Sequence, residues 1–211
     1  MSTKTWIDWF VSTPRGKYFV KIDPSYLRDS FNLYDLRRML GEESSKYKLA
    51  LDVIRGVAFP PNQRPQDWPV DIDKYAEKLY GLVHARYLQT GTGLKDLYQK
   101  FQNGEYERCP RTACQGSTCI PYGEWEEPGI DKVKIFCPCC KEVYEPKPGA
   151  FHELDGAYFN HDYVILFLQR YTEICKERPP IELRLFGFRI EPEIPMYEEE
   201  DIQEEEEEYS E

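Results

Sequence analysis

Four of the seven cysteines in this 211-residue chain form two close pairs. Cys109 and Cys114 stand in CPRTAC, Cys137 and Cys140 stand in CPCC, and 22 residues separate the two pairs. Two thiol pairs of this kind, each held by a turn, supply the four ligands of a tetrahedral Zn²⁺ site. Since the protein would fill every position around the ion, the pattern predicts one structural Zn²⁺ per chain rather than a catalytic one.

The spacing alone leaves two choices open. Cys119 offers a second C-x4-C pair with Cys114, and Cys139 competes with Cys140. Cys137 and Cys139 are only two positions apart, whereas zinc-binding turns favour two to four intervening residues. Ordinary buried thiols or disulfides are the other interpretation. The odd number of cysteines, and the presence of six of them within 32 residues, disfavour it.

The formal net charge of −11 comes from one end of the chain. Residues 198–211 hold ten Asp or Glu and no Lys or Arg, which leaves 28 acidic and 27 basic residues elsewhere. This nearly neutral body lacks the basic excess typical of nucleic-acid-binding proteins. We expect residues 193–211 to form a disordered acidic tail, because so charged a segment cannot bury apolar surface.

The chain shows no apolar run near the roughly 18 residues of a membrane span, and MSTKTWIDWF is not a signal pattern. We therefore expect no membrane association. A reducing cytoplasmic or nuclear setting is expected instead, and it favours metal-bound thiolates over disulfides.

Apolar residues recur at helical spacing in the N-terminal half. Such stripes run over residues 47–58, 76–87 and 94–101, and each predicts a helix with one face in the core. His84 falls within the second stripe. We expect it to be packed or hydrogen-bonded rather than to bind a metal.

Helix boundaries are indicated by capping residues and breakers. Asn32, with Asp35 three residues later, resembles a helix start, and Thr92 is a candidate cap for the third stripe. Residues 59–70 contain four prolines and are expected to form a loop.

The pattern changes after Gly104. Residues 133–136 alternate into the second cysteine pair, and Val143 and Tyr144 lead out of it, which is the strand–turn–strand order of a zinc ribbon. Residues 163–174 predict a buried helix, and residues 183–190 predict a short extended segment.

These elements together predict an α+β protein. A mostly helical N-terminal region is followed by a zinc-ribbon β module and a C-terminal extended segment. The expected domains are a helical domain (1–104), a zinc-ribbon domain (105–160), a helix with an extended segment (161–192) and the acidic tail (193–211).

Motifs that carry catalysis are missing from the sequence. It contains no GxxxxGK phosphate loop, no HEXXH, no GxSxG, and neither HRD nor DFG. A binding or scaffolding protein is therefore favoured over an enzyme.

Several segments nevertheless resemble one known family. The run AEKLYGLVHARYLQTGTGLKDLYQKFQNGEYERCPR at 76–111 closely resembles the regulatory beta subunit of casein kinase II. The same resemblance extends, in the family's order, to WIDWF at 6–10, FNL at 31–33, the YxxALDxI pattern at 47–54, DGAYF at 155–159 and RLFGFRIEP at 184–192.

The resemblance implies a non-catalytic subunit that modulates the stability and substrate choice of a Ser/Thr kinase. The family's zinc ligands fall on Cys109, Cys114, Cys137 and Cys140. Two beta subunits pair through their zinc ribbons, and each dimer carries two catalytic kinase subunits that act on protein substrates. Residues beside the cysteines, Pro110, Val143 and Tyr144, are candidates for the apolar two-fold patch.

The resemblance also places the kinase anchor. The family's Tyr-Gly-Phe sequence falls on Phe186, Gly187 and Phe188, and exposed aromatic rings seated in a partner's pocket are common binding hot spots. Phe186 lacks the hydroxyl of the family's tyrosine. The family's acidic loop and N-terminal serine–glutamate cluster have no counterpart here. The acidic tail is expected to be a solvated segment, and binding of polyamines by the tail is the alternative. The alternatives are an orphan zinc-ribbon module that binds protein or nucleic acid, and an enzyme with an unrecognised site.

Overall fold

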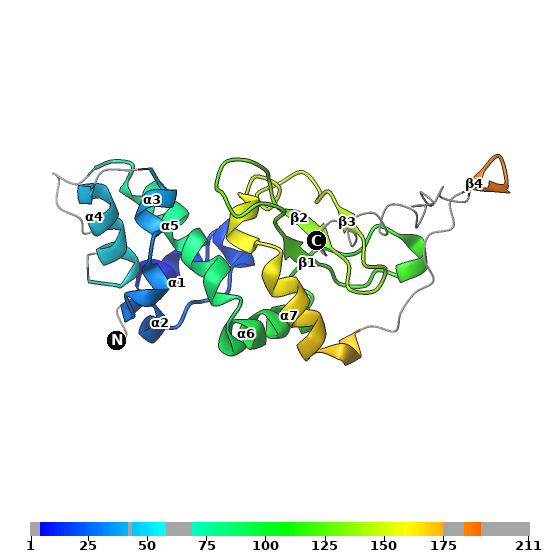
Figure 1. Ribbon diagram of the computed structural model, residues 1–211, viewed down its shortest axis with the longest axis horizontal. Helices are drawn as coiled ribbons and strands as arrows, with labels where there is room; N and C mark the ends of the chain where they lie inside the picture. The colour runs from blue at the N-terminus through cyan, green and yellow to red at the C-terminus, as the bar shows by residue number, and fades with distance from the viewer. Residues whose placement is uncertain (1–4, 42–43, 58–68, 175–183, 191–211) are drawn as a thin grey trace, which may run out of the picture. The chain divides into compact units, whose positions relative to one another are not determined.

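The computed structural model of this protein describes residues 5–41, 44–57, 69–174 and 184–190 (Figure 1). The chain divides into two compact units, Met1–Arg178 and Pro179–Glu211. The described part of the first unit combines helices with a small sheet, and that of the second is a hairpin. The predicted α+β class is therefore confirmed. No helix in the described ranges has the length and hydrophobicity needed to cross a membrane.

Short and long helices account for most of the first unit. The α-helices are α1 (Trp6–Phe10), α2 (Pro24–Arg28), α3 (Leu36–Met39), α4 (Ser44–Ile54), α5 (Ile72–Tyr87), α6 (Gly91–Gln102) and α7 (Asp162–Arg170). Single 3₁₀ turns are η1 (Gly16–Tyr18), η2 (Phe31–Leu33), η4 (Thr112–Cys114), η5 (Gly156–Phe159) and η6 (Thr172–Ile174).

The first helix begins at a capping box that the sequence analysis did not predict. The Thr5 hydroxyl accepts from the Asp8 backbone N–H at 3.2 Å, and the Asp8 carboxylate accepts from the Thr5 N–H at 2.9 Å. These two bonds satisfy donors that a helix start leaves free. Trp6 and Phe10 are then buried on one face, and the Trp6 indole N–H donates to Asp73 of α5 at 2.7 Å.

The three predicted stripes lie in α4, α5 and α6, but both predicted helix starts are wrong. Asn32 lies inside η2, where its amide donates to the Tyr26 carbonyl instead of capping a helix. Thr90, not Thr92, caps α6, because its extended backbone lets its hydroxyl accept from the Gly93 N–H at 3.0 Å. The expected loop at 59–70 and the end of the first stripe at Ala58 lie largely outside the described residues.

Helix α5 lies at the centre of the first unit. It packs against α4 on one side and η5 on another, as Figure 1 shows. Gly81 makes the second contact close, since a Cβ atom there would come within 2.4 Å of the buried Tyr158 ring. Glycine inside a helix costs roughly 1 kcal/mol relative to alanine. Gly81 therefore lowers the helix propensity of α5 but allows η5 to pack closely against it.

His84 is buried and hydrogen-bonded through both ring nitrogens, as expected. Nε2 accepts from the Val20 backbone N–H at 3.1 Å, and Nδ1 lies 2.9 Å from the Tyr158 carbonyl oxygen, to which it donates. Burial lowers the pKa of His84 to about 3, so the ring is neutral at physiological pH.

The sheet consists of three short antiparallel strands in the order β1-β2-β3. Strands β2 (Lys134–Phe136) and β3 (Val143–Tyr144) flank the second cysteine pair and match the predicted strand pattern. Strand β1 (Ile120–Tyr122) was not predicted, and it pairs with β2 through Ile120 opposite Phe136.

Helix α7 is shorter and less buried than expected. It ends at Arg170, and η6 occupies the rest of the predicted range. Tyr163 and Phe167 are buried, whereas Ile165 is 58% exposed, so only one face of the helix reaches the core. The Tyr163 hydroxyl donates to the Pro121 carbonyl and thereby connects α7 to β1.

Candidate functional site

Two turns of the same design carry the four paired cysteines. In the first turn, Cys109 N–H donates to the Ser117 carbonyl at 2.8 Å, and in the second, Cys137 N–H donates to the Glu142 carbonyl at 3.0 Å. A left-handed residue follows the last cysteine of each turn: Gln115 at φ 53° and Lys141 at φ 59°. These reversals bend the chain so that both thiols of a pair face the same point.

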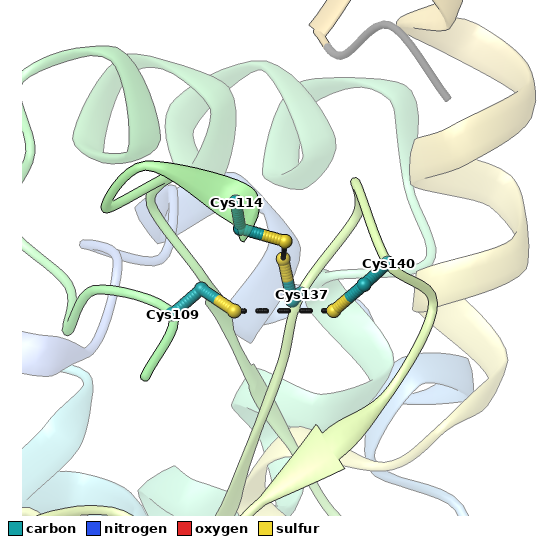
Figure 2. Close-up of side chains that lie close together, drawn as sticks. All are labelled: Cys109, Cys114, Cys137 and Cys140. Atoms are coloured by element: carbon teal, nitrogen blue, oxygen red, sulfur yellow. Dashed lines mark hydrogen bonds between the residues drawn. The ribbon is translucent and has the colours of Figure 1, made fainter. Parts of the chain in front are cut away.

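The two turns bring all four thiols together. Cys109, Cys114 and Cys137 are buried and Cys140 is half-buried, and their sulfur atoms all lie within 4.8 Å of one another. Figure 2 shows the sulfurs in two facing pairs, Cys109 with Cys140 and Cys114 with Cys137, each 3.9 Å apart. Four such thiols could hold a metal ion.

The spacing of the sulfur atoms fits Zn²⁺. A Zn–S bond of about 2.3 Å in a tetrahedron places neighbouring sulfurs roughly 3.8 Å apart, close to the 3.9 Å of both pairs. Thiolates are soft ligands, and four of them in tetrahedral array suit zinc or iron–sulfur chemistry rather than magnesium or calcium.

The electrostatics favour one ligand as a thiolate before any metal binds. The Cys119 thiol donates a hydrogen bond to Cys137 and holds its pKa well below its usual range. The backbone N–H groups of Cys140 and Cys139 act in the same direction, while burial opposes them. Burial raises the pKa of Cys109 and Cys114, so a metal must displace protons from those two thiols.

The competing cysteines lie outside the group of four. Cys119 is fully buried beside Cys137, and its hydrogen bond to Cys137, together with burial, raises its pKa. Cys139 is also buried but is not among the four gathered thiols. Sequence spacing alone is compatible with either cysteine as a ligand, and three-dimensional placement separates both from the other four.

Sequence reasoning missed one hydroxyl beside the thiols. The Tyr144 oxygen lies 3.2 Å from the Cys140 sulfur, within hydrogen-bonding distance. The signal was present in the sequence, because a tyrosine four residues after the last cysteine on an adjoining strand can turn back toward it. From the sequence, Tyr144 is predicted only as part of a dimer patch.

The residues considered for that patch differ in exposure. Pro110 is exposed, Val143 is 40% exposed and Tyr144 is half-buried. Val143 and Tyr144 form β3, which pairs with β2 at one edge of the three-stranded sheet. A dimer contact at these residues stays a prediction.

The second unit presents the Phe-Gly-Phe segment at the end of a hairpin. Strand β4 (Arg184–Leu185) pairs with β5 (Phe188–Arg189), and Leu185 lies opposite Phe188. Phe186 at φ 50° and Gly187 at φ 89° form the two-residue turn. Two positive φ angles are the signature of a type I′ turn, which matches the twist of paired strands.

This turn exposes both aromatic rings. Phe186 is 92% exposed and Phe188 is 78% exposed. The left-handed conformation of Phe186 costs a non-glycine residue roughly 1–2 kcal/mol, whereas Gly187 adopts it freely. Among the described residues, no contact of the Phe186 ring offsets the free-energy cost of this backbone conformation. That is a reason to consider a binding partner that contacts the ring.

Comparison with known proteins decides the relationship. The model of the family described as "Casein kinase II regulatory subunit" matches residues 5–189. The chain belongs to this family. The match extends from the capping box of α1 to the last strand of the hairpin, so both cysteine pairs and the Phe-Gly-Phe segment lie inside it.

Individual casein kinase II relatives support the same conclusion. Casein kinase II subunit beta of Dictyostelium discoideum is 34% identical over 88% of this chain and 68% of its own length. Casein kinase II subunit beta' of Drosophila melanogaster is 35% identical over 89% and 84%, respectively. The beta subunit of Schizosaccharomyces pombe is 31% identical over 93% and 84%.

Proposed function

We propose that the protein is a non-catalytic regulatory subunit that binds the catalytic subunit of a casein kinase II-like Ser/Thr protein kinase. The observation that carries this proposal is the pair of exposed rings, Phe186 and Phe188, on a two-residue turn in a member of this family. A small number of aromatic anchors commonly supplies most of the free energy of binding at such interfaces.

The cysteine group supports a structural role for zinc within this function. One Zn²⁺ per chain would be held by the four gathered thiolates and would cross-link two turns about a sheet of only two- and three-residue strands. Bound there, the metal would supply folding free energy rather than chemistry on a substrate. The zinc-ribbon assignment of residues 105–160 is part of this proposal.

The proposal also includes an assembly. We place a homodimer contact beside the metal, at Pro110, Val143 and Tyr144, with two catalytic subunits bound per dimer. The assembled kinase would then direct phosphorylation toward chosen protein substrates in cytoplasm and nucleus. The predicted domain 161–192 would contain the docking rings, and the predicted helical domain 1–104 would complete the same chain.

The decisive experiment replaces both aromatic anchors. Phe186→Ala combined with Phe188→Ala should weaken binding to the catalytic subunit by about 2 kcal/mol or more, roughly thirtyfold, in isothermal titration calorimetry. Zinc content and dimer mass should not change. Phe186→Tyr, which restores the residue typical of the family, should bind at least as tightly as the wild type. Wild-type affinity of the double alanine variant would place the docking surface elsewhere.

An orphan zinc-ribbon module is the competing function, and co-purification distinguishes the two. Recovery of a kinase subunit supports the regulatory role. Recovery of nucleic acid would support the orphan module, and recovery of neither partner would favour an enzyme with an unrecognised site.

A further inference from the structure

The four gathered thiols differ in how well the protein covers them. Cys109, Cys114 and Cys137 are at most 5% exposed, whereas Cys140 is half-buried. Water, protons and thiol-reactive molecules therefore reach the group most easily at Cys140. A residue that stabilises the sulfur of Cys140 should control how firmly the group holds a metal ion.

The backbone supplies hydrogen-bond donors to the first thiol of each pair. The Arg111 N–H donates to the sulfur of Cys109. In the second turn, the N–H groups of Cys139 and Cys140 donate to the sulfur of Cys137. Four thiolates around one Zn²⁺ ion leave an excess of negative charge, and each donor offsets part of it. Hydrogen bonds to the sulfurs are therefore part of what would keep a metal in this site.

A side-chain donor lies beside the half-buried thiol. The Tyr144 oxygen is 3.2 Å from the Cys140 sulfur. Tyr144 follows the second turn on β3 and pairs with Ile135 of β2, which fixes the strand that carries the hydroxyl. A metal-bound thiolate has no proton, whereas a phenol with an ordinary pKa of about 10 keeps its proton at physiological pH. The hydroxyl is therefore the donor, and the sulfur the acceptor, when a metal is bound.

We propose that Tyr144 is a positioning residue of the metal site, whose hydroxyl donates to the Cys140 thiolate and slows the loss of zinc at this ligand. The inference rests on the proposed zinc site. It gives the hydroxyl a role separate from the proposed dimer contact, which requires only the apolar ring. A hydrogen bond to a charged sulfur makes it less ready to take up a proton or to attack an electrophile. Loss of such partners commonly weakens metal binding by about 10–100-fold.

Tyr144→Phe removes the hydroxyl and leaves the aromatic ring. Full-length proteins loaded with Zn²⁺ are mixed with the chelating dye 4-(2-pyridylazo)resorcinol, and we expect zinc to leave Tyr144→Phe about tenfold faster or more than wild type. Tyr122→Phe is the matched control, because Tyr122 is a half-buried tyrosine on β1 of the same sheet. Among the described residues, no hydrogen bond joins its hydroxyl to a thiol. This control should release zinc at the wild-type rate.

Two further measurements distinguish a lost hydrogen bond from a loosened strand. With Co²⁺ in place of Zn²⁺, the sulfur-to-metal charge-transfer absorption of Tyr144→Phe should shift, because a hydrogen bond to sulfur lowers the energy of its electrons. At low extents of alkylation by N-ethylmaleimide, peptide fragmentation in the mass spectrometer should locate the increased reaction at Cys140. Alkylation at Cys109, Cys114 and Cys137 should stay at the wild-type level.

The results distinguish this role from the metal site on which it rests. Equal rates of zinc release from Tyr144→Phe and Tyr122→Phe would overturn the role of the hydroxyl and leave the zinc site intact. Equal increases in alkylation at all four thiols would mean that the substitution loosens β3, and a lost dimer with unchanged zinc release would assign the hydroxyl to the dimer contact. Either result overturns the proposal. Wild-type protein that binds no zinc would refute the site itself, and with it this role for Tyr144.

Discussion

Tyr80 and His84 lie one helical turn apart on α5 and hydrogen-bond the same extended segment of backbone. The Tyr80 hydroxyl donates to the Val20 carbonyl at 2.8 Å, and His84 Nε2 accepts from the Val20 N–H at 3.1 Å. Tyr80 also accepts from the Ile22 N–H at 3.2 Å. Two side chains thus satisfy backbone groups that a neighbouring strand would satisfy in a sheet.

The burial of His84 predicts that the folded protein loses stability in acid. The pKa of His84 is about 3 in the folded protein and near 6.5 when unfolded. Because the folded value is the lower one, the unfolded chain binds more protons, and stability is full above about pH 6.5 and falls as the pH drops toward 3. Between these pH values, the loss in the free energy of unfolding should approach about 1.4 kcal/mol per pH unit. Urea titrations of wild type and His84→Gln at pH 7 and pH 5 measure it. Equal losses in both proteins would exclude His84 as the cause.

Removal of one thiol should remove the metal. Cys137→Ser deletes the ligand that is most readily ionised, so elemental analysis should find no zinc and light scattering should find no dimer. Cys119→Ser is the matched control, since it removes a buried thiol adjacent to Cys137 but outside the group of four. We expect Cys119→Ser to retain both zinc and the dimer, as we do for Cys139→Ser. A full zinc complement in Cys137→Ser would contradict the ligand assignment.

The dimer contact can be tested at the sheet edge. Val143→Lys places a charge on β3 and should weaken self-association tenfold or more, because an unpaired charge in an apolar interface is costly. Ile130→Lys alters a residue of similar type that is 52% exposed and should have no effect. Light scattering at micromolar concentration would reveal the difference, and a zinc-loaded wild-type monomer would rule out the dimer altogether.

A substitution in the hairpin turn distinguishes the effect of backbone strain from the effect of the aromatic ring on binding. Phe186→Asn creates Asn-Gly, the pair that type I′ turns prefer, so the hairpin should remain or become more stable. The first anchor ring is nevertheless lost, and affinity for the catalytic subunit should fall at least tenfold by calorimetry. Retained affinity would mean that the ring at this position does not contact the partner.

Close packing at Gly81 predicts a large effect from one methyl group. Gly81→Ala would force the buried Tyr158 ring to move, and overpacking of this kind typically costs about 1–3 kcal/mol. Gly91→Ala in the first turn of α6 is the control, because its added Cβ would meet nothing closer than Arg170 at 3.9 Å. Chemical denaturation should show a loss for the first variant and none for the second.

The acidic tail lies outside the described residues, and its role rests on charge alone. If ten carboxylates in residues 198–211 attract polyamines, deletion of this segment should abolish a response that is strong at low salt and weak at high salt. The opposing expectation is that the acidic tail is solvated and binds no ligand. An unchanged polyamine response after deletion would support it.

Periodicity found the long helices because their apolar faces repeat at regular spacing. It failed at helix starts, where Thr90 and Thr92 have similar local sequences and only the backbone geometry of the turn before α6 selects Thr90. Strand β1 escaped prediction because Pro121 stands at its centre, and a proline inside a segment argues against a strand assignment.

The candidate site, like the fold, was only partly predictable from the sequence. The cysteine spacing indicated a metal site but could not exclude Cys119, since two thiols near one another in sequence are separated only by the folded path of the turn. Family resemblance supplied the assignment that spacing lacked.

Three buried tyrosine hydroxyls form hydrogen bonds to residues that are distant in the sequence. These long separations bear on the order of folding. Tyr80 bonds Val20 across 60 residues, and Tyr106 donates to the Tyr18 carbonyl across 88. Tyr163 bonds Pro121 across 42. Closing such loops has an entropic cost that is recovered only once both ends are in place. The backbone groups of residues 18–22 therefore reach their final hydrogen-bond partners only after α5 and the residues beyond it have been synthesised.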